Sequence, residues 1–122
     1  MLEIFDIIGP VMIGPSSPHT AGAVRIGKYA RSILGSKPIE AEIRFCGSFA
    51  KTYRGHGTDK AIIAGILGMD TDDERIKNSL AIAKEGGLDY TFVTKQIDNV
   101  HPNTAEILLR GDAGNEVLVR GS

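Results

Sequence analysis

The chain has 122 residues, 42% of them hydrophobic, and its 14 basic and 15 acidic residues give a formal net charge of −1. This size and composition favour one folded domain over a disordered chain, and the balanced charge gives no electrostatic basis for binding nucleic acid or an anionic membrane surface. No apolar run reaches the roughly 20 residues of a membrane span, the acidic N-terminus is not a secretory signal, and the lone Cys46 excludes an internal disulfide, so we expect a cytoplasmic protein.

The first half of the chain predicts a loop, a helix and a strand. Residues 2–18 predict an apolar start followed by an irregular loop, because three prolines prevent a continuous helix. A helix is predicted from Thr20, capped by Thr20 or Ser17 and ended by Gly35. Its apolar positions recur at helical spacing, at Ala23, Ile26, Gly27, Ala30, Ile33 and Leu34. The run "PIEAEIRFCG" then alternates, which predicts a strand whose buried face carries Ile39, Ala41, Ile43 and Phe45.

The second half predicts two helices and three strands. "TDKAIIAGILGM" predicts a helix capped by Thr58 or Asp59. "TDDERIKNSLAIAKEGG" predicts another, with a capping box from Thr71 to Glu74 and an end at the two glycines. Its apolar stripe consists of Ile76, Leu80 and Ala83. "YTFVTK", "TAEILLRG" and "NEVLVRG" predict strands, the last two joined as a hairpin through "GDAGN". We therefore expect one α+β domain with about three helices and a mixed or antiparallel sheet of four to five strands.

The first polar cluster lies in "GPSSPHTAGAVRIGKYA", residues 14–30, where the first helix begins. A helix N-terminus presents unpaired backbone N–H groups and a partial positive charge. Ser16, Ser17, His19 and Thr20 add side chains that can donate hydrogen bonds there. This combination suits a carboxylate or a phosphate. The alternative is an ordinary Ser/Thr-capped helix after a proline-rich turn, with His19 in solvent.

The second polar cluster is "RGHGTD", residues 54–59, where His56 stands between two glycines and Asp59 opens a helix. Flanking glycines permit unusual backbone angles and close approach of a substrate. His56 is therefore a candidate general base, oriented by Asp59 or a hydroxyl. The alternative is a tight turn with an exposed histidine and Asp59 as the N-cap. Because both clusters precede helices, we hypothesise that the two helix starts face one pocket.

His101 and Cys46 are weaker candidates. His101 lies in "DNVHPNT", where Pro102 favours an extended backbone, and it is either an ordinary loop residue or a residue at the rim of a site. Cys46 falls on the strand face opposite Phe45, and we expect a buried, inert thiol. The chain has no Cys-x-x-Cys or His-x-x-x-His pair for a metal site of its own, and one cysteine cannot hold an iron–sulfur cluster.

Taken together, "GPSSPHTAGAVRIG" and "GHGTD" resemble the β portion of bacterial iron–sulfur-dependent L-serine dehydratases (L-serine ammonia-lyases). The segments "FCGSFAKTYRGHGTDKAIIAGILGM" and "HPNTA" follow the same family pattern, so the resemblance covers essentially the whole chain. It implies a fold like that of the allosteric substrate-binding domain, a module shared with some phosphoglycerate dehydrogenases. It also implies a β-type domain over residues 1–122. A terminal strand without its next partner is a hazard, so we expect either that the natural polypeptide continues beyond Ser122 or that this chain is a fragment of it. The resemblance implies that an ACT-type regulatory module often follows at that point in the family.

The resemblance further implies that L-serine is converted to pyruvate and ammonia at a site shared with an α subunit or domain that holds a 4Fe–4S cluster. One iron without a cysteine ligand acts there as a Lewis acid on the serine hydroxyl, and a base removes the Cα proton. Carried onto this chain, the base is His56. The residues that hold the carboxylate and neighbouring groups are Ser16, Ser17, His19 and Thr20, and those that support the loops are Thr58, Asp59 and His101. Pro18 departs from the serine frequent in the family, which removes one hydroxyl and one N–H donor.

We expect the isolated chain to be inactive and to function in an oligomer, formed by copies of this chain or with the α partner. A rival function is a module that binds a small carboxylate such as serine and regulates a neighbouring domain, with His56 in an ordinary loop. A second rival is an anion-binding domain for a phosphorylated metabolite. A self-contained hydrolase is disfavoured, because the chain has no Gly-x-Ser-x-Gly elbow.

Overall fold

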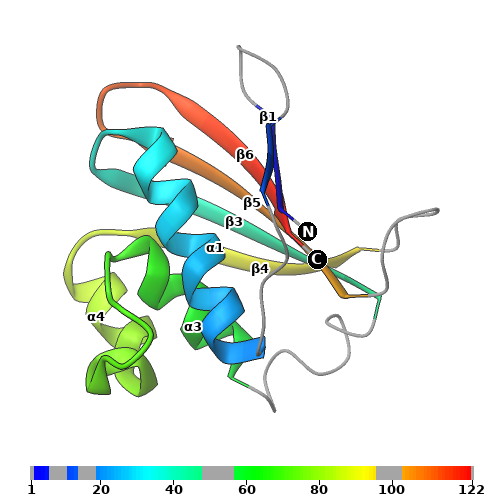
Figure 1. The fold of residues 1–122 in the computed structure, drawn as a ribbon. Coiled ribbons are helices and arrows are strands. Elements are labelled where there is room, and N and C mark those ends of the chain that lie inside the picture. The colour runs from blue at the N-terminus through cyan, green and yellow to red at the C-terminus, as the bar shows by residue number, and fades with distance from the viewer. Residues whose placement is uncertain (1, 6–10, 14–18, 48–56, 96–102, 122) are drawn as a thin grey trace.

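The structure, a computed structural model, describes residues 2–5, 11–13, 19–47, 57–95 and 103–121 (Figure 1). In these ranges six strands form one sheet in the order β2-β1-β6-β5-β3-β4. The strands are β1 (Leu2–Phe5), β2 (Val11–Ile13), β3 (Pro38–Gly47), β4 (Asp89–Lys95), β5 (Asn103–Gly111) and β6 (Glu116–Gly121). The helices lie against one face of this sheet (Figure 1), and they are α1 (His19–Leu34), α3 (Thr58–Ile66), the 3-10 helix η1 (Glu74–Asn78) and α4 (Ser79–Glu85).

This architecture confirms the predicted α+β class with a mixed sheet, since β3 and β4 are parallel and the other described neighbours are antiparallel. The sheet exceeds the expected four to five strands, because the residues predicted as an irregular start include the short pair β1–β2, with Leu2 opposite Ile13. This pair joins the sheet through β6, where Leu2 lies opposite Gly121. The predicted hairpin around "GDAGN" is confirmed as β5–β6, with Arg110 opposite Glu116.

The hydrophobic core lies between the sheet and helices α1 and α3. Ile43, Ile107 and Val119 stand side by side on β3, β5 and β6, and each has 0% exposed surface. The helices contribute Val24, Ala30, Ile62, Ile63 and Ile66 to the same cluster. The alternation predicted for β3 thus places its apolar face toward the helices.

Two isoleucines predicted on buried faces are exposed instead. Ile33 is 37% exposed. The buried face of α1 contains Val24, which is 0% exposed, and Ile33 lies on the other side of the helix, toward solvent. Ile39 is 38% exposed. The register between β3 and β5 shifts between Pro38 and Glu40, and such a bulge takes a side chain out of the regular alternation.

The first predicted helix is confirmed, with α1 beginning at His19 and ending before Gly35, whose φ is 71°. Thr20 lies inside this helix, so its prediction as the cap is wrong. The cap predicted for the next helix is wrong. The N-cap of α3 is Gly57, with φ 72° and no side-chain hydrogen bond at the cap, so Thr58 and Asp59 are the first two residues of the helix. Glycine occupies this position because a left-handed backbone costs an L-residue roughly 1–2 kcal/mol.

The third predicted helix begins later than its sequence pattern indicates. The capping box from Thr71 to Glu74 is not formed, and Asp73 is the N-cap of η1 instead. Its carboxylate accepts a hydrogen bond from the Arg75 N–H at 2.8 Å. The chain then continues through η1 into α4, which begins at Ser79.

The face of the sheet away from the helices carries charged side chains. Glu106 is 3% exposed and lies in register between Arg44 and Arg120 on the neighbouring strands. Arg120 Nη2 is 2.9 Å from Glu106 Oε2, and Arg44 Nη1 is 3.8 Å from Glu106 Oε1. On the same face, Arg110 Nη2 lies 2.8 Å from Glu116 Oε1, and these two side chains are 48% and 47% exposed.

The turn between β5 and β6 is bonded to the end of α1. Ser36 Oγ donates to Asn115 Oδ1 at 2.8 Å, and Asn115 Nδ2 donates to the Leu34 carbonyl at 2.5 Å. The Asp112 N–H donates to the Lys37 carbonyl at 2.9 Å. The end of the sheet that holds this turn is therefore fixed to the helix layer.

Candidate functional site

The strand registers bring the flanks of the three candidate segments to one end of the sheet, which we call the carboxyl edge. Strands β2, β3, β4 and β6 end at this edge, and β1 and β5 begin there. Gly47 is paired with Asn103, and its neighbour Cys46 is paired with Lys95. Ile13 lies at the same edge, linked through Leu2 to Gly121.

The candidate residues that lie outside the described residues belong to three segments of the sequence. The described elements next to each segment end or begin at the carboxyl edge. Ser16 and Ser17 lie between β2 and α1, His56 lies between β3 and α3, and His101 lies between β4 and β5. The structure describes none of these four residues. The described chain on either side of each segment nevertheless meets the carboxyl edge, which keeps the hypothesis of a shared site open.

Helices α1 and α3 start at this same edge and run parallel to each other (Figure 1). Residues further along α1 contact residues further along α3. Gly27 lies against the backbone of Ile62 and Gly65, and further along α1 the Arg31 Nη1 donates to the Ile66 carbonyl at 2.8 Å. Because the helices are parallel neighbours, the backbone starts at His19 and Thr58 lie at one end of the domain.

The two helix starts differ in charge. The first turn of α1 contains no acidic residue, whereas the first turn of α3 contains Asp59. Asp59 is 8% exposed, and its carboxylate accepts the Lys60 N–H at 2.8 Å. Negative charge is stabilised at a helix N-terminus, so Asp59 already occupies the favourable position on α3. An external anion therefore has its better seat at the start of α1, among residues that include His19 and Thr20, whose side chains the structure does not describe.

Thr58 and Asp59 are buried, at 3% and 8% exposure. Burial suits side chains that hold a loop in place better than side chains that contact a ligand. Gly57, directly before them, has a φ of 72°, and its carbonyl accepts the Ala61 N–H at 3.0 Å. The backbone that leads from His56 into α3 therefore passes through a left-handed turn favoured by glycine.

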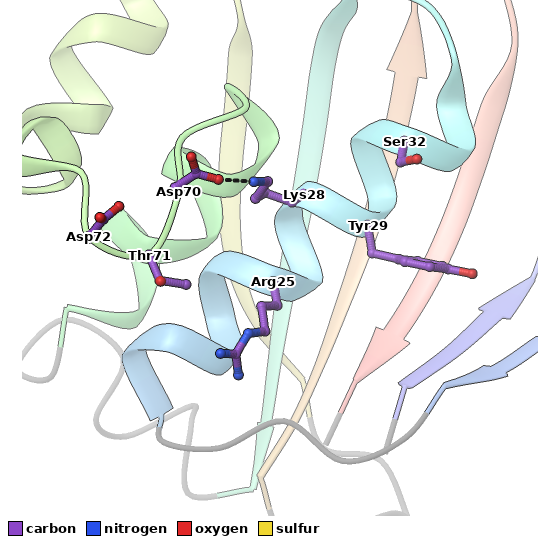
Figure 2. Close-up of a pocket in the computed structure, with 7 residues that line it drawn as sticks. All are labelled: Arg25, Lys28, Tyr29, Ser32, Asp70, Thr71 and Asp72. Carbon is purple, nitrogen blue, oxygen red and sulfur yellow. Dashed lines mark hydrogen bonds and ion pairs between the residues drawn. The ribbon is translucent and has the colours of Figure 1, made fainter.

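A pocket of about 690 Å³ lies on the outer side of α1 (Figure 2). It is lined by Arg25, Lys28, Tyr29, Ser32, Asp70, Thr71 and Asp72. In Figure 2 the Lys28 and Asp70 side chains point toward one another as an ion pair, and they are 40% and 74% exposed. The residues that line this pocket include none of the predicted site residues.

Within the described ranges, no group of three or more His, Cys, Asp or Glu side chains is arranged to hold a metal ion. Cys46 is 0% exposed, which confirms the predicted burial of the thiol. In the same part of the chain, no helix is long and apolar enough to cross a membrane.

The residues that bring the helix starts together were not predicted as functional. The sequence pattern places Gly27 only in the apolar stripe of the first helix and gives Gly65 no role. The available signal was an isolated glycine within each helical pattern, which costs about 1 kcal/mol relative to alanine and therefore indicates a special packing role.

Comparison with known proteins gives consistent matches. The family described as serine dehydratase beta chain matches residues 2–96. The "Probable L-serine dehydratase, beta chain" of Bacillus subtilis (strain 168) is 57% identical over 112 residues, which cover 92% of this chain and 51% of the relative. The "L-serine dehydratase, beta chain" of Peptoniphilus asaccharolyticus is 48% identical over 119 residues, covering 97% of this chain and 54% of that one.

A shorter match is to "L-serine dehydratase 2" of Escherichia coli (strain K12), 39% identical over 74 residues, which is 56% of this chain and 16% of the relative. The chain spans about half the length of the two beta-chain relatives. The family match covers most of the chain, and both long matches carry the beta-chain name. This chain therefore belongs to the serine dehydratase beta chain family.

Proposed function

We propose that this chain supplies the substrate-binding residues and the general base of an L-serine dehydratase, at a site completed by an α partner. The products are pyruvate and ammonia. The α partner is implied by the beta-chain name of the relatives and by the resemblance of the sequence motifs. The relatives' names favour this function over the regulatory module.

The observation that carries the proposal is the parallel pairing of α1 and α3 at the carboxyl edge. Both helices begin where the flanks of the candidate segments meet, so two polar clusters about forty residues apart in sequence have their helix starts at one end of the domain. A regular helix pair with opposite directions would have put these starts at opposite ends. The parallel arrangement therefore supports one shared site.

In this proposal the start of α1 binds the carboxylate of serine. Its backbone N–H groups and helix dipole favour an anion, and Ser16, Ser17, His19 and Thr20 complete the seat. Asp59 already neutralises the start of α3, which leaves that helix to hold the base rather than the carboxylate.

His56 removes the Cα proton of the bound serine. Histidine has an ordinary pKa of about 6.5, so a substantial fraction of the imidazole is neutral and able to accept a proton at pH 7–8. Loss of the proton and of hydroxide gives aminoacrylate, which water converts to pyruvate and ammonia. Thr58 and Asp59 support the loop that carries His56, and His101 supports the site from the segment before β5.

The iron–sulfur cluster belongs to the α partner in this proposal. A cluster needs about three or four cysteine ligands, and this chain has one cysteine, which is buried in β3. The residues of this chain therefore do not fit a cluster, and its own contribution is to bind serine and to move the Cα proton. A single free cysteine is typical of a reducing cytoplasm.

The test is His56→Ala in the full-length chain assembled with its α partner, with pyruvate formation from L-serine as the assay. Loss of a general base lowers kcat by roughly 10²–10⁴-fold, and added imidazole should restore part of the activity. Ser32→Ala, on the exposed outer side of α1, is the matched control and should keep wild-type kcat. Turnover in His56→Ala within tenfold of wild type would reject the base assignment.

A thermal-shift experiment on the chain without its partner addresses the regulatory alternative. A ligand at 100 times its Kd adds about 2.7 kcal/mol of stability. Stabilisation by serine, combined with full turnover in His56→Ala, would favour a serine-sensing module over a catalytic one. Stabilisation by phosphate esters but not by serine would favour an anion-binding domain.

A further inference from the structure

The geometry points to Gly27 and Gly65 as positioning residues, which set the separation of the two helix starts and therefore the distance between the carboxylate seat and the base. This inference rests on the proposed function, because it assigns those two roles to the starts of α1 and α3. It adds two residues in the middle of the helices, far from the polar clusters, to the set that controls the reaction.

The two glycines face each other where α1 and α3 cross. A Cβ built on Gly27 would lie 3.0 Å from the Gly65 Cα and 2.9 Å from the Ile66 N, and closer still to the Ile62 carbonyl oxygen. A Cβ on Gly65 would lie 2.9 Å from the Gly27 Cα and 2.8 Å from the Lys28 N, and closer still to the Val24 carbonyl oxygen. The atoms met on both sides are backbone atoms, so a change of side-chain rotamer cannot make room.

Any side chain at either glycine must therefore push the helices apart. Ordinary carbon contacts lie at about 3.5–4.0 Å, so the separation at the crossing has to grow by roughly 1 Å. Beyond the crossing, Arg31 holds the two helices in register through its hydrogen bond to the Ile66 carbonyl at 2.8 Å. With that part of the pair tied, a displacement at the crossing passes to the helix starts.

The distance from the crossing to the helix starts is short. Gly27 lies eight residues after His19, and Gly65 lies seven residues after Thr58. At 1.5 Å per residue, both starts are roughly 10–12 Å from the crossing. A short helix shifts as one body, so a change of about 1 Å at the crossing becomes a similar change between the two helix starts.

A misplacement of about 1 Å between reacting groups can cost roughly 10²-fold in rate. We therefore expect Gly65→Ala and Gly27→Ala to lower kcat/KM for L-serine by 10- to 100-fold. Both kcat and KM should change. A displaced seat raises KM, and a displaced base lowers kcat. A purely structural role would reduce only the fraction of folded enzyme, which lowers the apparent kcat and leaves KM unchanged.

The experiment uses the full-length chain assembled with its α partner, assayed at a temperature at which each variant is folded by circular dichroism. Controls for stability are Ile107→Val and Ile107→Ala, which weaken the core from the sheet side without inserting an atom between the helices. For each glycine variant, the matched control is the Ile107 variant with the same loss in Tm, and this control should keep the wild-type KM. A KM for the glycine variants equal to that of the matched control overturns the positioning role, as does failure of both glycine variants to assemble.

His56→Ala, measured in parallel, separates this inference from the proposed function. Full activity in His56→Ala together with a raised KM in Gly65→Ala would reject the base assignment alone. Loss of activity in His56→Ala together with normal kcat/KM in folded Gly65→Ala would reject the positioning role alone.

Discussion

Glu106 gives the most direct test of how the sheet is held together, because the same Glu–Arg pairing occurs twice on one face at different burial. The carboxylate of Glu106 is 4% exposed between Arg120 and Arg44, which are 31% and 26% exposed. Glu116 and Arg110 make a similar pair that is about half exposed. Replacing each glutamate by glutamine removes one negative charge and keeps the size of the side chain.

The expected losses in the free energy of unfolding differ by several-fold between the two variants. Removing one partner of a buried ion pair costs about 3–5 kcal/mol, because the remaining charges lose their compensation. Here Arg120 would lose Glu106 as its carboxylate partner, whereas Arg44 would keep Glu42, whose Oε2 accepts from Arg44 Nε. Glutamine still accepts a hydrogen bond, so we expect the lower value, about 3 kcal/mol, for Glu106→Gln. An exposed pair contributes about 0–1 kcal/mol, which is the expectation for Glu116→Gln.

Urea unfolding followed by circular dichroism measures the difference. For a small domain the slope is about 1–3 kcal/mol per molar urea, so with a slope near 2 the midpoint of Glu106→Gln should fall by about 1.5 M. The midpoint of Glu116→Gln should fall by less than about 0.5 M. Equal midpoint shifts for the two variants would refute the reasoning that burial decides the contribution of these pairs.

Three further predictions concern the described residues. The hydrogen bonds from Arg75, first from its side chain and then from its backbone, lower the pKa of Asp73 from 3.8 to about 2. The stability from this contact should therefore be complete above about pH 4 and be lost as the pH falls toward 2. An NMR titration of the Asp73 carboxyl carbon checks the cause, because the pKa should be lower in wild type than in Arg75→Ala. Cys46 should resist alkylation in the native chain and react in urea, because it is 0% exposed; rapid native alkylation followed by mass spectrometry would contradict this. Gly57→Ala should lower the free energy of unfolding by about 1 kcal/mol, and Gly57→Asn by less, because asparagine tolerates a positive φ better; equal losses in thermal unfolding would argue against a backbone cause.

The elements that were predicted from sequence are those set by local patterns. The alternation in β3 and the glycine-containing turn of β5–β6 specify those strands without help from distant residues, and Gly35 ends α1 where its sequence indicates. The pair β1–β2 was missed, because strands of four and three residues are too short to show a period. Ile39 was misplaced, because a register shift depends on the partner strand and leaves no mark in its own sequence.

The candidate site was predictable only in part. The polar clusters at the two helix starts are visible as residue types, and Thr58 and Asp59 lie at the start of α3, as its first two residues and not as the predicted cap. Whether those starts share one end of the domain depends on the parallel direction of α1 and α3, a tertiary property that periodicity does not contain. The roles in the site stay predictions for all of the candidate residues, which are Ser16, Ser17, His19, Thr20, His56, Thr58, Asp59 and His101.

The hydrogen bonds between the β5–β6 turn and the end of α1 have a mechanical consequence. They fix the C-terminal end of a helix of 16 residues, so this fixed point is a pivot about 24 Å from the helix start that carries the proposed anion seat. A tilt of only 2–3° about that pivot displaces the seat by about 1 Å. The position of the proposed seat therefore depends on how precisely the β5–β6 turn sets the direction of α1.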